Sequence, residues 1–286
     1  MSAFVRLQHV LPHHAVSRAL GRLAAAEAPW VRGPLVRAFA RVYGVDMSEA
    51  ERADLGGYAS FNDFFTRSLA PGARPIDPAA GSVVSPADGA VSQSGVIERG
   101  ELIQAKGVRY SFAALADACA GPGFEGGPFA TVYLSPSDYH RVHLPLAGRL
   151  VRTVAVPGRL FSVNATTEAG VPGLFAVNER LVMEFETEFG QMLVVMVGAM
   201  IVASIETVWD GPRSPYSEKT VTRHDLAFEK GAEIGRFLLG SSVVLAFEAG
   251  RVALDPSLVA GAAVRMGRPI GAGSGEARPV GRSREP

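Results

Sequence analysis

From Val83 onward the sequence consists of short strand-like segments separated by glycine-containing turns, and this pattern constrains the fold most strongly. Three segments, Ala130–Leu134, Arg149–Val156 and Ser241–Phe247, are rich in the β-branched and aromatic residues that favour strands. Leu181–Phe189 alternates apolar residues with glutamates, the period of two that predicts a half-buried strand. A doubly wound sheet would require regular alternation of helices and strands, and the sequence lacks it. We therefore predict the α+β fold class, with a mainly antiparallel β core that follows short amino-terminal helices.

Two further expectations concern strands near the end of this core. Met192–Val197 and Met200–Ile205 are apolar throughout, which predicts two buried strands bent at Gly198. Residues 249–250 predict a turn that pairs residues 251–254 with the preceding strand as a hairpin.

The first 45 residues are basic and are interrupted by prolines. They contain six arginines and one acidic residue, Glu27, in a chain whose net charge is zero. Pro12, Pro29 and Pro34 are expected to divide this region into short helices, each with a start or stop near a proline. Basic amphipathic helices that contain Trp and Phe are typical of segments that lie in an anionic membrane interface. The alternative is a helical cap whose apolar face packs on its own domain, and both interpretations remain open.

Composition divides the chain into four regions and limits what it can bind. We expect a membrane-associating helical segment over 1–45, a helix and Pro-rich connection over 46–82, a β-rich catalytic core over 83–270 and a disordered tail over 271–286. A single cysteine, Cys119, excludes an intramolecular disulfide and a thiolate-rich zinc site, and it favours a reducing compartment. The balanced charge gives no indication of nucleic-acid binding, and no apolar stretch reaches the roughly 20 residues that a spanning helix needs.

Three polar segments interrupt the otherwise apolar β region. The first is a turn that contains Asp88. The second contains His140 and His143, and the third leads into a strand at Ser241. A carboxylate, an imidazole and a hydroxyl are the groups that activate a serine, although a turn aspartate, core histidines and a loop serine would look the same. Two histidines three residues apart could also bind a metal, but no third ligand has typical spacing, so no metal site is predicted.

Many short sequence motifs are distributed along nearly the whole chain. They are Tyr43-Gly44-Val45-Asp46-Met47, Phe61-Asn62-Asp63-Phe64-Phe65-Thr66-Arg67, Arg74-Pro75-Ile76-Asp77, Pro86-Ala87-Asp88-Gly89, Gln104-Ala105-Lys106-Gly107, Tyr139-His140-Arg141-Val142-His143, Leu160-Phe161-Ser162-Val163-Asn164, Asn178-Glu179-Arg180, Val197-Gly198-Ala199, Gly235-Arg236-Phe237 and Leu239-Gly240-Ser241-Ser242. From about Leu7 to Ile270 the chain resembles the long, bacterial, membrane-bound type of phosphatidylserine decarboxylase. The family signature usually ends in Gly-Ser-Thr, and Ser242 here keeps a small β-hydroxyl residue after the reactive serine.

The resemblance implies a proenzyme that cuts itself between Gly240 and Ser241. In that reaction the Ser241 hydroxyl attacks the Gly240 carbonyl and converts the peptide into an ester. Elimination of the ester leaves dehydroalanine, which tautomerises and hydrolyses to ammonia and a pyruvoyl group. The products are chains 1–240 and 241–286, which stay associated. The resemblance also implies that His143 takes the hydroxyl proton and that Asp88 holds its ring in the productive tautomer.

The same resemblance implies the reaction, the cofactor and the location. The amine of phosphatidylserine would form a Schiff base with the pyruvoyl group derived from Ser241, lose carbon dioxide and yield phosphatidylethanolamine, with no metal and no pyridoxal phosphate. His140 is the candidate proton donor and Ser162 a candidate substrate-binding residue. We expect a peripheral protein on the cytoplasmic face of the inner or plasma membrane, and a homodimer. A serine hydrolase that uses Ser241, His143 and Asp88, and a catalytically silent membrane-binding domain, remain as alternatives.

Overall fold

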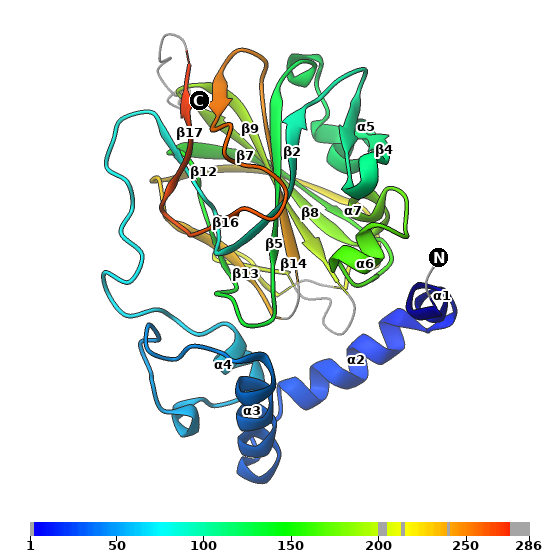
Figure 1. Ribbon diagram of the computed structural model, residues 1–286, viewed down its shortest axis with the longest axis vertical. Helices are drawn as coiled ribbons and strands as arrows, with labels where there is room; N and C mark the ends of the chain where they lie inside the picture. Colours follow the sequence, from blue (N-terminus) through cyan, green and yellow to red (C-terminus); the bar gives the residue numbers. More distant parts are fainter. Residues whose placement is uncertain (1–2, 200–204, 213–214, 239–240, 275–286) are drawn as a thin grey trace.

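An eight-stranded antiparallel sheet forms the centre of the molecule (Figure 1). The structure is a computed structural model, and it describes residues 3–199, 205–212, 215–238 and 241–274. In the order in which they lie side by side, the strands are β12 (Thr220–Phe228), β7 (Gly148–Val156), β8 (Arg180–Thr187), β9 (Gly190–Gly198), β14 (Ser241–Phe247), β5 (Pro128–Leu134), β2 (Gly89–Val96) and β16 (Ala263–Val264). Every pairing between these strands is antiparallel, which confirms the predicted fold class.

Two smaller sheets cover one face of the central sheet. The first contains, in order, β11 (Gly211–Pro212), β10 (Ile205–Thr207), β13 (Glu233–Phe237) and β6 (Arg141–His143). The second contains β1 (Ser82–Val84), β17 (Pro269–Gly273) and β15 (Val252–Leu254). Side chains alternate between the two faces of a strand, so Val243 and Leu245 of β14 point into this layer. There they pack in one apolar core with Phe237 and Ile270 of the smaller sheets.

Short helices and a two-stranded ribbon cover the opposite face. These elements are β3 (Glu101–Ile103), β4 (Arg109–Ser111), α5 (Phe112–Ala116), α6 (Ala165–Glu168) and α7 (Leu174–Val177). Four short 3-10 turns lie elsewhere along the described chain: η1 (Leu55–Gly57), η2 (Ala105–Gly107), η3 (Asp117–Cys119) and η4 (Pro122–Phe124). Val244 and Ala246 of β14 lie in this second core together with Phe112 and Phe175. Strand β14 is therefore buried on both faces.

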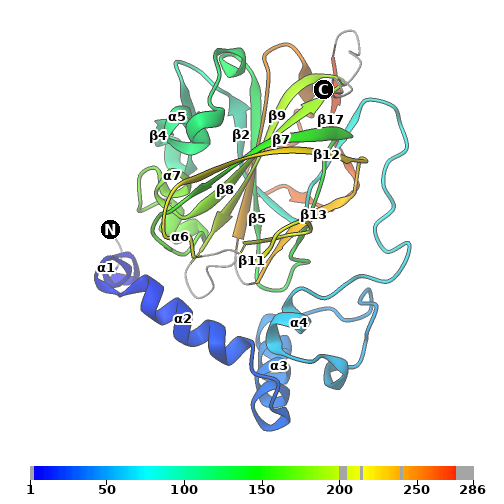
Figure 2. The same ribbon diagram turned by 180° about the vertical axis from the view of Figure 1, so that it is seen from behind.

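Four helices precede the sheets. They are α1 (Ala3–Val10), α2 (His13–Ala24), α3 (Pro29–Tyr43) and α4 (Phe61–Phe65). Figures 1 and 2 both place α3 and α4 beyond the end of the central sheet where β5 ends and β14 begins, with α1 near α6. Pro12 and Pro29 mark helix starts as predicted, whereas Pro34 lies inside α3, where its missing N–H removes only one hydrogen bond near the helix start. None of the described helices has the length and hydropathy to cross a bilayer.

Three expectations about strands need correction. The predicted hairpin is wrong because β15 pairs with β17, and both edges of β14 are already occupied by β5 and β9. Strand β8 is buried on both faces rather than one, because Arg152 neutralises Glu184, which is only 5% exposed. Strand β17 extends to Gly273, past the predicted start of the tail. Residues 275–286 of that tail and 200–204 of the predicted second apolar strand lie outside the described residues.

Candidate active site

Three of the strands meet at the end of the central sheet that faces α3 and α4. There β14 begins at Ser241, whose backbone pairs with Leu134 at the end of β5 and with Gly198 at the end of β9. Asp88 directly precedes β2 at this same end. A Cβ on Gly89 would lie 2.2 Å from a carbonyl oxygen of β5, so only glycine allows this close approach. Gly240, on the other side of the predicted cleavage bond, lies outside the described residues.

His143 ends β6, and its ring is held in one tautomer. Its Nδ1 lies 2.8 Å from the carbonyl oxygen of Gly231, which can only accept, so Nδ1 carries the proton. Its Nε2 therefore has a free electron pair, which accepts a hydrogen bond from the Tyr139 hydroxyl at 3.0 Å. Burial lowers the pKa of His143 below its ordinary value of 6.5, against the opposing effects of the Gly231 bond and of Glu233 and Asp88. A neutral imidazole with an unprotonated Nε2 is the form that can act as a general base.

Asp88 belongs to an ion-pair network that the sequence interpretation missed. Its carboxylate accepts from Arg74 Nε at 2.9 Å and from Arg74 Nη2, and it accepts from the Met266 amide at 2.9 Å. Arg74 Nη2 also donates to Glu49 at 2.8 Å. The hydrogen bonds to Asp88 and Glu49 raise the pKa of the Arg74 guanidinium. The bond that was expected between Asp88 and His143 is made instead by Gly231, although the His143 amide donates to Pro86, two residues before Asp88.

His140 directly precedes β6, in the segment that connects β5 to β6. Its imidazole is neutral. Its ring stacks on Phe65 with centroids 4.0 Å apart, and its Nε2 donates to the Ser135 carbonyl at 3.0 Å. Its Nδ1 has no hydrogen-bond partner among the described residues. Burial, with a further effect from Arg67, lowers the pKa of His140 to about 3. In this state His140 holds no imidazolium proton that it could donate.

Buried polar atoms without partners occur on Arg67, His140 and Ser242, residues of three segments around the ends of β5 and β14. Arg67 is 4% exposed, and its Nη2 donates to the Ser137 carbonyl at 2.9 Å. Its Nε and Nη1, the Ser242 Oγ and the His140 Nδ1 all lack partners within the described part of the chain. Since buried polar atoms are nearly always paired, such a group marks a place where another polar group is accommodated. The motif Phe61–Arg67 was visible in the sequence, but no pattern there assigned a role to its arginine.

The neutral state of His140 predicts how stability depends on pH. An unfolded chain binds a proton at this residue near pH 6.5, whereas the folded chain does so only near pH 3. The free energy of unfolding should therefore decrease by about 1 kcal/mol per pH unit as the pH falls from 6.5 towards 3. Chemical denaturation midpoints over this range measure the effect, and His140→Phe, which keeps the ring stacking, should flatten the curve. Equal slopes for the variant and the natural chain would contradict the assignment.

Ser162 lies on the opposite side of the central sheet, among residues of the second core. Its neighbours Phe161 and Val163 are buried there. Its amide donates to Gln8 Oε1 at 2.8 Å, and its hydroxyl accepts from the Asn164 amide at 3.5 Å. Among the described residues, the hydrogen bonds of Ser162 do not reach Asp88, His140 or His143. Its loop is linked to the start of β14 through the side chain of Asn178, which bonds to the backbone of Phe161 and of Gly198.

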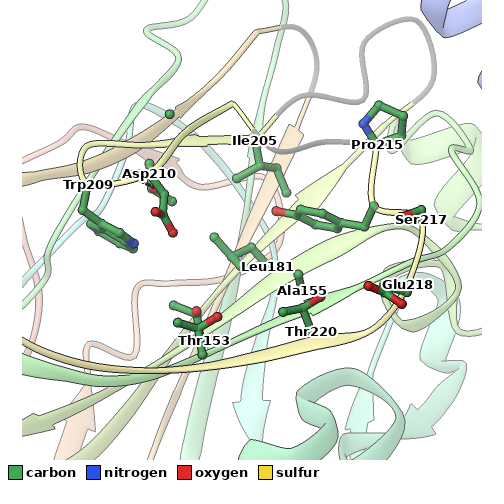
Figure 3. A pocket seen from close by; sticks show the side chains of 14 residues that line it. Thr153, Ala155, Leu181, Ile205, Trp209, Asp210, Pro215, Ser217, Glu218 and Thr220 are labelled. Carbon is green, nitrogen blue, oxygen red and sulfur yellow. Dashed lines mark hydrogen bonds between the residues drawn. The ribbon is translucent and has the colours of Figure 1, made fainter.

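A cavity of about 170 Å³ lies over β7, β8 and β12 on the face that carries the smaller sheets. Figure 3 shows Trp209 and Asp210 at one end of it and Ser217 and Glu218 at the other. None of the predicted site residues lines it.

Within the described residues, no group of three or more His, Cys, Asp and Glu side chains could hold a metal ion. Burial raises the pKa of the Cys119 thiol to about 12.

Comparison with known proteins identifies the family. A family model described as phosphatidylserine decarboxylase matches residues 61–272, well over half of the chain. The chain belongs to the phosphatidylserine decarboxylase family. A second family model, described as PSD, matches residues 3–44, which include the three amino-terminal helices of this decarboxylase.

Similar relatives cover nearly the whole length of the chain. Phosphatidylserine decarboxylase proenzymes of Azotobacter vinelandii, Ectopseudomonas mendocina and Pseudomonas aeruginosa are 52%, 53% and 54% identical to it. These alignments cover 95%, 94% and 92% of this decarboxylase and 98%, 97% and 94% of the respective relatives. The family resemblance seen in the sequence is confirmed, and so is the prediction of a carboxy-lyase made as a proenzyme.

Proposed function

We propose that this protein converts phosphatidylserine into phosphatidylethanolamine and carbon dioxide, with a pyruvoyl group made from its own Ser241. Family membership supports the reaction. The observation that carries the self-processing chemistry is the neutral, buried His143, whose tautomer the Gly231 carbonyl fixes so that Nε2 is unprotonated. The Nε2 electron pair can accept a proton once the Tyr139 hydroxyl, which donates to it, turns away.

The first step of processing is an acyl shift at the start of β14. The Ser241 hydroxyl loses its proton to His143 Nε2 while its oxygen attacks the Gly240 carbonyl carbon. The Gly240–Ser241 amide bond then breaks, its nitrogen takes a proton, and an ester joins the two residues. Loss of the Ser241 Cα proton expels the Gly240 carboxylate, and one water molecule hydrolyses the resulting enamine, by way of its imine, to the keto group and ammonia.

The pairing of β14 supports the proposal that the two chains stay together after cleavage. Strand β14 begins the smaller chain, and it is hydrogen-bonded on both edges to β5 and β9 of the larger one. Both of its faces are buried in apolar cores. Separation would expose that surface and break both ladders, which makes dissociation costly. The homodimer stays a prediction from the family resemblance.

Asp88 contributes to the proposal through charge rather than through a hydrogen bond to His143. Its negative charge favours the imidazolium that forms when His143 accepts the serine proton, and Arg74 holds the carboxylate in place. His140 can serve as a proton donor only after its unpartnered Nδ1 has taken up a proton. Ser162 is proposed to contact the substrate.

The residues around the start of β14 fit a pyruvoyl group. His140 Nδ1 and the free Arg67 nitrogens are buried polar atoms that can hydrogen-bond to an added polar group or to a charged lipid head. A pyruvoyl group supplies a carbonyl that withdraws electrons while carbon dioxide leaves.

The amino-terminal helices are proposed to hold the enzyme on an anionic bilayer, on the cytoplasmic face. Val10, Trp30 and Val42 are 78%, 80% and 75% exposed, and five of the six arginines of this segment are also exposed. Apolar and cationic side chains on the same helices are typical of interfacial binding. The other interpretation, a cap that packs on its own domain, accounts for a different set of residues in these helices, including the buried Val36 and Ala40.

Intact-mass measurement of the purified protein tests the proposal. We expect two polypeptides, 1–240 and 241–286. The smaller one should be lighter than the unmodified 241–286 peptide by one ammonia, and it should resist sequencing from its amino end. A serine hydrolase would be one continuous chain labelled by a serine-directed probe. A silent membrane-binding domain would be continuous and unlabelled. Active material with an uncut chain would refute the proposal.

A further inference from the structure

Helix α1 inserts a buried glutamine into the loop that contains Ser162. Gln8 is 1% exposed, although it lies on a helix at the edge of the molecule. Its Oε1 accepts from the Ser162 amide at 2.8 Å, and its Nε2 donates to Thr167 Oγ1 at 3.1 Å. One side chain thus satisfies a backbone group of the loop and a side chain of α6.

His13, at the start of α2, makes a second tie to the same loop. Its Nδ1 accepts from the Leu160 amide at 3.2 Å, and its Nε2 donates to the Gln8 carbonyl. Its ring also meets the Phe161 ring edge-on, with centroids 4.9 Å apart. The Leu160 and Ser162 amides are therefore both satisfied by groups from the amino-terminal helices. A loop that lost these helices would leave two N–H groups without their partners.

The other side of the loop is bonded to the strand that neighbours Ser241. Asn178 accepts from the Phe161 amide at 3.0 Å through its Oδ1. Its Nδ2 donates to the Phe161 carbonyl at 2.8 Å and to the Gly198 carbonyl at 2.9 Å. Gly198 ends β9 and pairs with Ser241. A continuous set of hydrogen bonds therefore runs from Gln8 through the loop and Asn178 to the backbone beside Ser241.

The same helices expose the surface that the proposed function assigns to the membrane. Val10 follows Gln8 by two residues and is 78% exposed. Arg6, on α1, and Arg18, on α2, are exposed as well. One side of α1 and α2 thus faces solvent with apolar and cationic groups, while the other side holds the loop through Gln8 and His13.

We propose that Gln8 is a positioning residue that couples membrane docking of the amino-terminal helices to the order of the loop 158–164 beside the reactive strand. This inference rests on the proposed function. A bilayer that fixes α1 and α2 also fixes Gln8 and His13, and through them the Leu160 and Ser162 amides. The enzyme is then most active when its helices are docked, which is where its lipid substrate is found.

The test is Gln8→Met in the full-length protein, because methionine keeps the length of the side chain and removes both hydrogen bonds. Hydrogen exchange of residues 158–164 is measured with the protein bound to vesicles that contain phosphatidylserine. We expect exchange at least about 10-fold faster in the variant, and a kcat on these vesicles reduced by a similar factor, since one or two net hydrogen bonds are lost. Vesicle binding and self-cleavage should equal those of the natural protein. Unchanged exchange and kcat at equal vesicle binding would overturn the proposal.

Two further variants separate this coupling from other effects. Trp30→Ala removes an exposed side chain of α3, so vesicle binding should weaken while loop exchange in the absence of vesicles stays as in the natural protein. His13→Ala breaks the Leu160 tie independently, and it decides the matter if Gln8→Met does not fold. Loop exchange that remains slow in a folded His13→Ala would also overturn the coupling. Failure of the proposed function would look different: the natural protein would be uncut and inactive, whatever the loop exchange.

Discussion

Replacing Ser241 by alanine should leave a continuous chain with no decarboxylase activity. Alanine has no hydroxyl to attack the Gly240 carbonyl, so neither the ester nor the keto group can form. The loss should be complete within detection, because the variant removes both the nucleophile of processing and the source of the cofactor. Intact mass and carbon dioxide release from phosphatidylserine vesicles measure the two consequences.

The matched control is the adjacent residue. Ser242 is buried, and its Oγ has no partner among the described residues, so Ser242→Ala removes a hydroxyl without breaking a described hydrogen bond. This variant should still be cut before Ser241, at a rate within about tenfold of the natural chain. If Ser241→Ala were cut at the same bond, or Ser242→Ala were the variant that stayed intact, the assignment of the nucleophile would be wrong.

Replacing His143 by alanine should slow self-cleavage about 100- to 10,000-fold, the usual contribution of a general base. Without the imidazole, the base that we assign to the Ser241 proton is missing. The time course of fragment formation after synthesis measures the effect. Because burial lowers the pKa of His143, cleavage of the natural chain should remain fast at pH 6.5 and slow only as the pH falls further.

Tyr139→Phe provides the control for His143. It removes the donor to Nε2 and leaves the Gly231 bond that fixes the tautomer. Cleavage should persist in this variant, because the Nε2 electron pair is then less engaged. A His143→Ala chain that is cut at the natural rate would show that another group takes the proton.

Much of the core could be predicted because strand formation depends on local composition. The β-branched and aromatic segments around Ala130, Arg149 and Ser241 all became strands of the central sheet. The partners of those strands could not be predicted in the same way. Turn residues after Phe247 favoured a hairpin, but β14 was already paired on both edges, so β15 joined β17 in another sheet.

The candidate site shows the same division. Local motifs were sufficient to single out Asp88, His140, His143 and Ser241, since each combines an unusual polar residue with an apolar β segment. Their hydrogen-bond partners could not be predicted. Every residue has a backbone carbonyl, so residue type does not indicate that the carbonyl of Gly231 would bond to His143. The Arg74–Asp88 pair joins residues that a Pro-rich stretch separates, and no periodic pattern places them together.

The sequence alone determined the fold class, the basic amino-terminal segment and the family, because these depend on composition and on the order of short motifs. Only the tertiary structure decided which groups hold His143 and Asp88, that the Ser162 loop is tied to α1, and that β14 lies between β5 and β9. The physical reason is that propensity acts between neighbours in the chain, whereas hydrogen-bond partners and burial are set by segments that meet after the chain has folded.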